Sequence, residues 1–286
     1  MAKLASIIAG LREHGSAWFM RGIAVLILAF LFFIAIGGIS QNDRWKITRV
    51  VVTGTQTVDS DTVEALVREK LKGNYYIAYA RENSEIFPRR DIEEGLLNVF
   101  PRLASAHADR VDMHTISVTV SERKPYALWC GEAYASDIHD LASCYFIDDT
   151  GFVFDRAPTF SDGVYLEVYG PLEGKQNENA LRADVPPAQF ALLYTVSQAL
   201  AHGLGEPLRI VLKPEGEVTV TMKKSAPYPV LAGVELRFKD STTAETLMKN
   251  LLAALPVQFP SDVILKKKLL YIDMRFGNKI FFGFEN

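Results

Sequence analysis

The sequence is short of cysteine and carries almost no charge imbalance, and both shortages exclude classes of protein. Only two cysteines, Cys130 and Cys144, occur among the 286 residues, with no second Cys pair or His pair at the spacing of a zinc site. The formal net charge of −3 does not provide the basic surface of a nucleic-acid-binding protein. We therefore expect no metal and no nucleic-acid partner. The two cysteines can pair in an oxidising compartment, and two free thiols remain the alternative.

Motifs of catalysis are also absent from the sequence. It contains no Gly-rich phosphate loop, and none of its five histidines forms an H-E-x-x-H pair. Ser121 and Lys124 fit the S-x-x-K pattern of penicillin-binding enzymes, but the partner motifs K-T-G and S-D-N are missing. We therefore expect no catalytic residue, no cofactor and no small-molecule substrate. A membrane-anchored extracytoplasmic enzyme is the weaker alternative, because an unfamiliar active site need not carry a known motif.

What the chain does have is one long run without an ionisable side chain, from Gly22 to Asn42. About 20 helical residues cross the hydrocarbon of a bilayer, so the run predicts a transmembrane helix over 22–42. Trp18 and Trp45 flank it, where indoles favour the membrane interface. A buried core helix is disfavoured because no polar stripe interrupts the run. A cleaved signal peptide is disfavoured because the charged leader and the apolar segment are both long.

The charges beside the span do not decide its orientation. Three Lys or Arg residues precede it and three follow soon after, so the positive-inside rule gives a tie. A short N-terminal tail before a span, with a large remainder after it, is the usual arrangement of a signal anchor. On this layout we expect residues 1–21 in the cytoplasm and the bulk of the chain outside the cytoplasmic (inner) membrane.

Hydrophobic periodicity divides the remainder into two predicted α+β regions, 45–122 and 123–286. In the first, the expected elements are a strand at 47–54, a helix capped by Asp59 or Ser60, a short helix from Asp91, and strands near 104–111 and 115–121. The second is expected to be a mixed β-domain with two helices packed on an extended sheet. Its second helix is expected to begin with a capping box of Thr242 and Glu245.

The last predicted strand, Lys279–Phe284, is rich in β-forming residues and follows a turn at Gly277 and Asn278. Ile280, Phe282 and Phe284 would share one face of this strand, and Phe281 would lie on the other. An edge strand presents unpaired N–H and C=O groups that can template a partner strand. If this strand is an open edge, β-strand addition by a partner is the natural function. A central or covered strand is the alternative.

Four segments together resemble one protein family. They are Ile47–Gly54, Val118–Ala127, Phe146–Phe154 and Leu270–Phe276. In this order, behind one membrane span, they resemble the bacterial cell-division family FtsQ/DivIB. The resemblance implies a POTRA domain at 45–122 and a non-enzymatic scaffold that links early and late division proteins at the septum. It also implies that the POTRA domain recruits other division proteins, and that an FtsB strand, with FtsL, joins the C-terminal sheet.

Carried over by position, the resemblance implies that Arg275, Phe276, Asn278 and Phe284 contact the partner. Ile280 and Phe282, on the same strand, are also expected to bind it. Arg275 would pair with an acidic partner side chain, and the phenylalanines would be apolar anchors. Two segments depart from the family: a longer loop at 131–142, and Glu215 with Gly216 where a basic contact is expected. Another POTRA-bearing secretion or assembly factor is the second reading, although such proteins usually carry several POTRA domains or a barrel.

Overall fold

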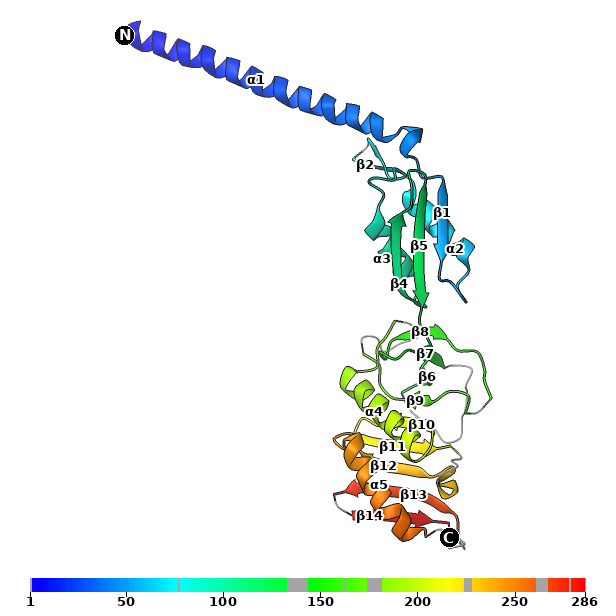
Figure 1. Cartoon of the computed structure of the whole chain (residues 1–286). Helices are drawn as coiled ribbons and strands as arrows, with labels where there is room; N and C mark the ends of the chain where they lie inside the picture. Colours follow the sequence, from blue (N-terminus) through cyan, green and yellow to red (C-terminus); the bar gives the residue numbers. More distant parts are fainter. Residues whose placement is uncertain are drawn as a thin grey trace. The chain divides into compact units, whose positions relative to one another are not determined.

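The computed structural model describes residues 2–76, 78–132, 144–161, 163–173, 182–223, 228–260, 267–277 and 279–285, with side chains from Met20 onward. The chain forms two compact units, Met1–Glu122 and Arg123–Asn286 (Figure 1). The fold is mixed α+β, with one apolar N-terminal helix and one large sheet, which confirms the predicted fold class at this level.

The first helix, α1 (Ala2–Ser40), contains a segment, Met20–Ser40, that is long and apolar enough to cross a membrane. The mean hydropathy of this segment is 2.8, and only 6% of it is buried in the protein. The helix is continuous through the predicted tail at 1–21 and ends two residues before the predicted end of the span. A short 3-10 turn, η1 (Asp43–Trp45), follows, and the side chain of Asn42 accepts a hydrogen bond from its backbone.

The first unit contains a three-stranded sheet in the order β1-β5-β4. Strand β1 (Arg49–Thr53) pairs in parallel with β5 (Thr115–Glu122), and β4 (Leu103–Arg110) pairs antiparallel to β5. Helices α2 (Ser60–Leu71) and α3 (Arg89–Val99) pack against it. The alternating residues of β5 face these helices in one buried cluster that includes Ile116, Val118, Val120, Val63, Val67, Ile92 and Leu96.

The chain between α2 and α3 contains an element that the sequence pattern does not predict. It forms a hairpin of two very short strands, β2 (Asn74–Tyr75) and β3 (Tyr79–Ala80). Two-residue strands carry no measurable periodicity, which explains why the pattern did not predict them. Helix α3 also begins at Arg89, two residues before the predicted start at Asp91.

The second unit contains a nine-stranded sheet in the order β14-β13-β12-β11-β10-β9-β6-β7-β8 (Figure 1). The strands are β6 (Ala127–Trp129), β7 (Tyr145–Ile147), β8 (Val153–Arg156), β9 (Glu167–Tyr169), β10 (Pro207–Leu212), β11 (Glu217–Met222), β12 (Glu235–Lys239), β13 (Leu269–Phe276) and β14 (Lys279–Phe284). Helices α4 (Pro187–Gly203) and α5 (Ala244–Gln258) pack on it, and a 3-10 turn, η3 (Pro229–Leu231), precedes β12.

Strand register decides which side chains face the helices. Ile210, Val220, Leu236, Ile272 and Phe282 are register partners across β10 to β14, and all belong to the core that α4 and α5 cover. Burying each such side chain fully contributes about 1.5–3 kcal/mol. The intervening residues of the same strands therefore form a second face that has no part in this core.

The start of α5 can be compared directly with its predicted cap. Thr243, not Thr242, caps α5, because its hydroxyl accepts the Thr246 N–H whereas the Thr242 N–H bonds to Lys239 in the preceding turn. The predicted capping box of Thr242 and Glu245 is thus wrong by one residue.

Cys130 and Cys144 form a disulfide that joins the end of β6 to the start of β7. This pairing decides between the two alternatives that the sequence left open. Of the predicted loop at 131–142, only its first two residues lie within the described part of the chain.

Candidate partner-binding edge of the sheet

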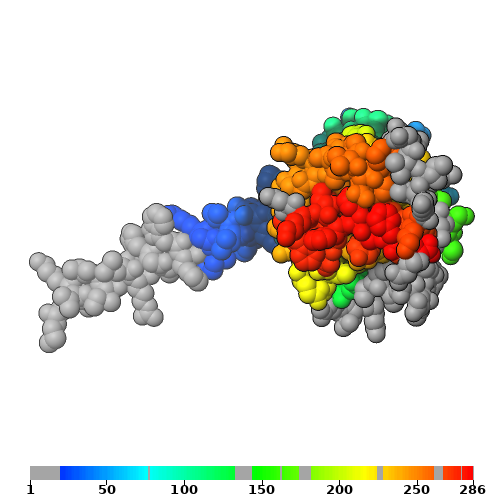
Figure 2. Space-filling model, turned by 90° about the horizontal axis from the view of Figure 1, so that it is seen from below, coloured from blue at the N-terminus to red at the C-terminus, as the bar shows by residue number. Residues whose placement is uncertain are grey.

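The large sheet ends in β8 on one side and β14 on the other, and the two ends differ. The outer side of β8 is covered by the segment Arg182–Val185: the Arg182 N–H donates to the Val153 carbonyl (2.7 Å), and the Val153 N–H donates to the Ala183 carbonyl (2.8 Å). Among the described residues, β14 has β13 as its only strand neighbour. The C-terminal residues, red in Figure 2, lie at the molecular surface. Strand β14 is therefore an open edge in the described part of the sheet.

The side chains of β14 divide between the two faces of the sheet. Ile280, Phe282 and Phe284 are half-buried against the core that the helices cover. Phe259, at the end of α5, has its ring centroid 5.6 Å from that of Phe282 and 6.4 Å from that of Phe284. These three β14 residues thus hold the strand on the sheet, and we expect any contribution to partner binding to be indirect.

The exposed aromatic side chains at this edge are Phe276 and Phe281. Their side chains are 58% and 49% exposed, and their rings meet edge to face with centroids 5.6 Å apart. Phe281 is the register partner of Asp273, which places it on the face away from the helices. Sequence alternation predicts this separate face for Phe281, whereas the family resemblance points to Phe284 as the contact residue.

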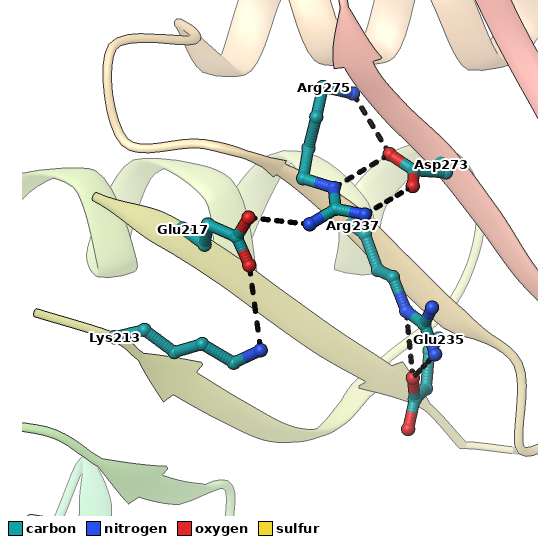
Figure 3. Close-up of polar contacts among 6 residues, drawn as sticks. All are labelled: Lys213, Glu217, Glu235, Arg237, Asp273 and Arg275. Carbon is teal, nitrogen blue, oxygen red and sulfur yellow. Dashed lines mark hydrogen bonds and ion pairs between the residues drawn. The ribbon is translucent and has the colours of Figure 1, made fainter. Parts of the chain in front are cut away.

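A ladder of charged side chains lies on this helix-free face, beside the open edge (Figure 3). Arg275 donates through Nε (2.9 Å) and Nη2 (2.6 Å) to the two carboxylate oxygens of Asp273, which is only 5% exposed. Its Nη1 donates to Glu217 on β11, and the other oxygen of Glu217 lies 3.5 Å from Lys213 Nζ. Arg275 therefore ties β13 to β11 across the intervening strand β12.

The middle strand of this ladder adds a second arginine. Arg237 on β12 donates to Glu235 at 2.6 Å and lies 4.2 Å above the ring of Tyr271. That ring extends over Gly283 of β14: a Cβ at Gly283 would lie 2.2 Å from it. The absence of a side chain at Gly283 therefore lets the tyrosine of β13 cover part of the edge strand.

The electrostatics of the ladder give Arg275 a role within the sheet. Its hydrogen bonds lower the pKa values of both Asp273 and Glu217, and those carboxylates raise the pKa of Arg275. The Nε, Nη1 and Nη2 atoms of Arg275 all donate to carboxylates within the sheet. In this structure Arg275 is a strut within the sheet, and its pairing with an acidic partner side chain stays a prediction.

The ladder predicts that acid weakens the second unit. Because the folded pKa values of Asp273 and Glu217 lie below their ordinary values of 3.8 and 4.5, their stabilising effect is complete above those values and is lost as the pH falls through the folded pKa values. The variant Arg275→Met should be less stable at neutral pH, with less further loss in acid. Thermal unfolding measured between pH 7 and about pH 3 tests this.

The matched control for this experiment is Arg237→Met, on the same face. Its partner Glu235 has a side chain that is 38% exposed, so removing this arginine leaves no buried carboxylate unpaired. Equal acid profiles for the two variants would contradict the strut role of Arg275.

The remaining predicted site residues give less information. Asn278 lies outside the described residues, and so does the side chain of Trp18. Trp45 is half-buried in η1, with the Arg44 guanidinium 5.8 Å from its ring centroid. The Ser121 hydroxyl lies 2.7 Å from that of Ser105 on the facing strand, so the S-x-x-K segment serves strand pairing here.

No group of three or more His, Cys, Asp or Glu side chains is arranged to hold a metal ion anywhere in the described ranges. The chain matches no protein-family model and no curated protein sequence. The class of protein is therefore argued from its own features: an α+β chain with an N-terminal apolar helix and a large sheet that has one open edge.

Proposed function

We propose that this protein is a membrane-anchored, non-enzymatic assembly factor whose edge strand β14 accepts a strand from a protein partner. The observation that carries the proposal is the contrast between the two ends of the large sheet. Residues 182–185 cover the β8 end, whereas β14 has no strand on its outer side in the described part of the chain. Main-chain hydrogen bonds to such an edge provide affinity, and flanking side chains provide specificity.

The composition of β14 supports this use of the edge. Natural sheets protect their edges with charges, prolines, bulges or short strands. Strand β14 is six residues long and contains one charged residue, Lys279, at its start. Its exposed aromatic neighbours, Phe276 and Phe281, form an apolar contact point beside the unpaired backbone. An edge of this kind is an aggregation hazard unless a partner covers it.

The order β1-α2-α3-β4-β5 in the first unit supports a POTRA domain of the kind found in the FtsQ/DivIB family, although the β2–β3 hairpin is an addition to the order expected from the sequence. We propose on this basis a role in cell division. The first unit would recruit other division proteins, and β14 would bind an FtsB-like partner together with FtsL at the septum.

The disulfide supports an orientation that the flanking charges leave undecided. Bonds such as Cys130–Cys144 persist in oxidising compartments and are rare in the cytosol. We therefore propose that α1 spans the cytoplasmic membrane, with its N-terminus inside and the chain that follows α1 outside. Anchoring then confines β14 near partners that are themselves anchored, which raises their effective concentration without any new contact.

The test of this function is purification of the full chain from mildly solubilised membranes. We expect a membrane-anchored coiled-coil protein of the FtsB class to come with it. Purification of the chain without any such partner, under conditions in which other membrane complexes stay intact, would contradict the proposal.

A further inference from the structure

The β2–β3 hairpin packs directly on the membrane-spanning segment of α1. Phe33, Gly37 and Ser40 lie on one face of the helix, since they are four and three residues apart. The Tyr79 ring meets the Phe33 ring edge to face, with centroids 4.9 Å apart, and its hydroxyl donates to the Phe33 carbonyl at 3.2 Å. The hairpin thus contacts the helix well before the helix ends.

Close approach is possible because Gly37 has no side chain. A Cβ at Gly37 would lie 2.4 Å from the Cβ of Ala78, in the turn between the two short strands. Two amide side chains fix the contact nearer the helix end: Gln41 donates to the Ala78 carbonyl, and Asn83 donates to the Ser40 carbonyl, each at 2.9 Å. The Asn83 bond also satisfies a carbonyl that the helix end would leave without a partner.

These contacts place the hairpin at a definite depth if α1 crosses the membrane as proposed above. At 1.5 Å per residue, the contacts from Phe33 to Ser40 extend about 10 Å down the helix from its end. The whole segment Met20–Ser40 is about 31 Å long, close to the thickness of the hydrocarbon core. Tyr79 and Ala78 therefore lie below the level at which the helix leaves the membrane.

From this juxtaposition we infer that the β2–β3 hairpin inserts into the interface between the headgroups and the hydrocarbon of the non-cytoplasmic leaflet and fixes the three-stranded sheet and its helices against the lipid surface. Its aromatic side chains suit that interface, where tyrosine rings are enriched. Tyr76, at the turn, is 81% exposed and has a φ of 48°, in the left-handed region that bulky residues rarely adopt. A strained, exposed tyrosine without a protein surface to cover it is explained by contact with lipid.

Part of the hairpin backbone is paired, which lowers the cost of placing it in a region of low water content, where unpaired polar groups are costly. Asn74 pairs with Ala80, and Tyr75 pairs with Tyr79. The Ala78 N–H donates to the Tyr75 carbonyl at 3.2 Å. Exposed basic residues such as Lys72, just before the hairpin, are placed to meet anionic headgroups.

Spin-label depth measurements test the inference on the full chain in vesicles of phosphatidylethanolamine and phosphatidylglycerol. Because the two native cysteines are disulfide-bonded, single cysteines introduced by Tyr76→Cys, Leu28→Cys and Val99→Cys can be labelled selectively with a nitroxide. Leu28 reports the middle of α1. Val99 is 54% exposed and lies shortly before β4 begins. The strand pairings place this start of β4 at the end of the three-stranded sheet away from α1, so Val99 reports the aqueous phase. The readout is accessibility to oxygen relative to a water-soluble nickel complex.

We expect the oxygen-to-nickel ratio at Tyr76 to be several-fold higher than at Val99, and highest at Leu28. If Leu28 is in the bilayer and Tyr76 matches Val99, the inserted hairpin is wrong and the anchor stands. If Leu28 itself matches Val99, the proposed anchor is wrong, and the hairpin inference with it.

A matched pair of glycines tests whether α1 sets the depth of the hairpin. Gly37→Leu fills the contact with Ala78, whereas nothing lies within 4 Å of the corresponding Cβ at Gly38. Both changes add the same apolar side chain to the same helix. We expect Gly37→Leu to lower the ratio at the Tyr76 label toward the aqueous value and Gly38→Leu to leave it unchanged. Equal effects of the two changes would overturn the role of the α1 contact.

Discussion

Replacing Phe281 with serine is expected to weaken partner capture by about 30-fold, which corresponds to the roughly 2 kcal/mol typical of a lost aromatic anchor. A strand added beside β14 would bring its side chains next to the Phe281 ring, and such cross-strand neighbours carry much of the pairing energy. The ring is half exposed and lies outside the core, so the substitution should leave thermal unfolding nearly unchanged. Titration of the partner against the purified chain measures the effect.

Leu252→Ser provides the matched control for Phe281→Ser. Leu252 lies on α5 and is 45% exposed, close to the 49% of Phe281, but it is on the helix side of the sheet. We expect binding of the Leu252 variant to be close to that of the unmodified chain. Phe276→Ser should act in the same direction as Phe281→Ser because the two rings are in contact. Loss of binding in the Leu252 variant, or none in the Phe281 variant, would place the partner elsewhere.

Removing the disulfide is expected to lower the free energy of unfolding of the second unit by about 3 kcal/mol. This magnitude follows from the 14-residue separation of Cys130 and Cys144, because the bond restricts the unfolded chain. For a unit of this size, 1 kcal/mol corresponds to about 2–4 °C, so the melting temperature should fall by about 6–12 °C. The double change Cys130→Ala and Cys144→Ala, followed by thermal unfolding, gives the value.

Treating both proteins with a reductant distinguishes the effect of losing the disulfide from the effect of removing the two sulfur atoms. The unmodified chain should lose stability when reduced, whereas the double alanine variant should be insensitive to the same treatment. A reduced chain as stable as the oxidised one would show that the bond contributes nothing to the folded state.

Features that follow from local pattern could be predicted from the sequence. The apolar segment of α1 was recognisable because no charge interrupts it, and β5 because Ile116, Val118 and Val120 alternate strictly. Helix α2 was recognisable from its cap at Asp59 and its buried face. In each case the signal lies within one continuous segment of the sequence.

Features that depend on distant pairing could not be predicted. One partner of Arg275, Glu217, lies 58 residues earlier in the sequence, and the two meet only because β13, β12 and β11 align in one register. The inward packing of Phe284 depends on Phe259 at the end of α5. Likewise, the contact between Gly37 and Ala78 requires the β2–β3 hairpin, for which the sequence gives no periodic signal.

The most direct test of strand addition is hydrogen exchange at the backbone amides of β14, Lys279–Phe284, with and without the bound partner. Strand addition predicts slower exchange in the bound state for those amides whose N–H groups point away from β13, with exchange in β11 and β12 nearly unchanged. If the partner binds at full affinity while every β14 amide exchanges at its free rate, the partner does not bind by adding a strand to this edge.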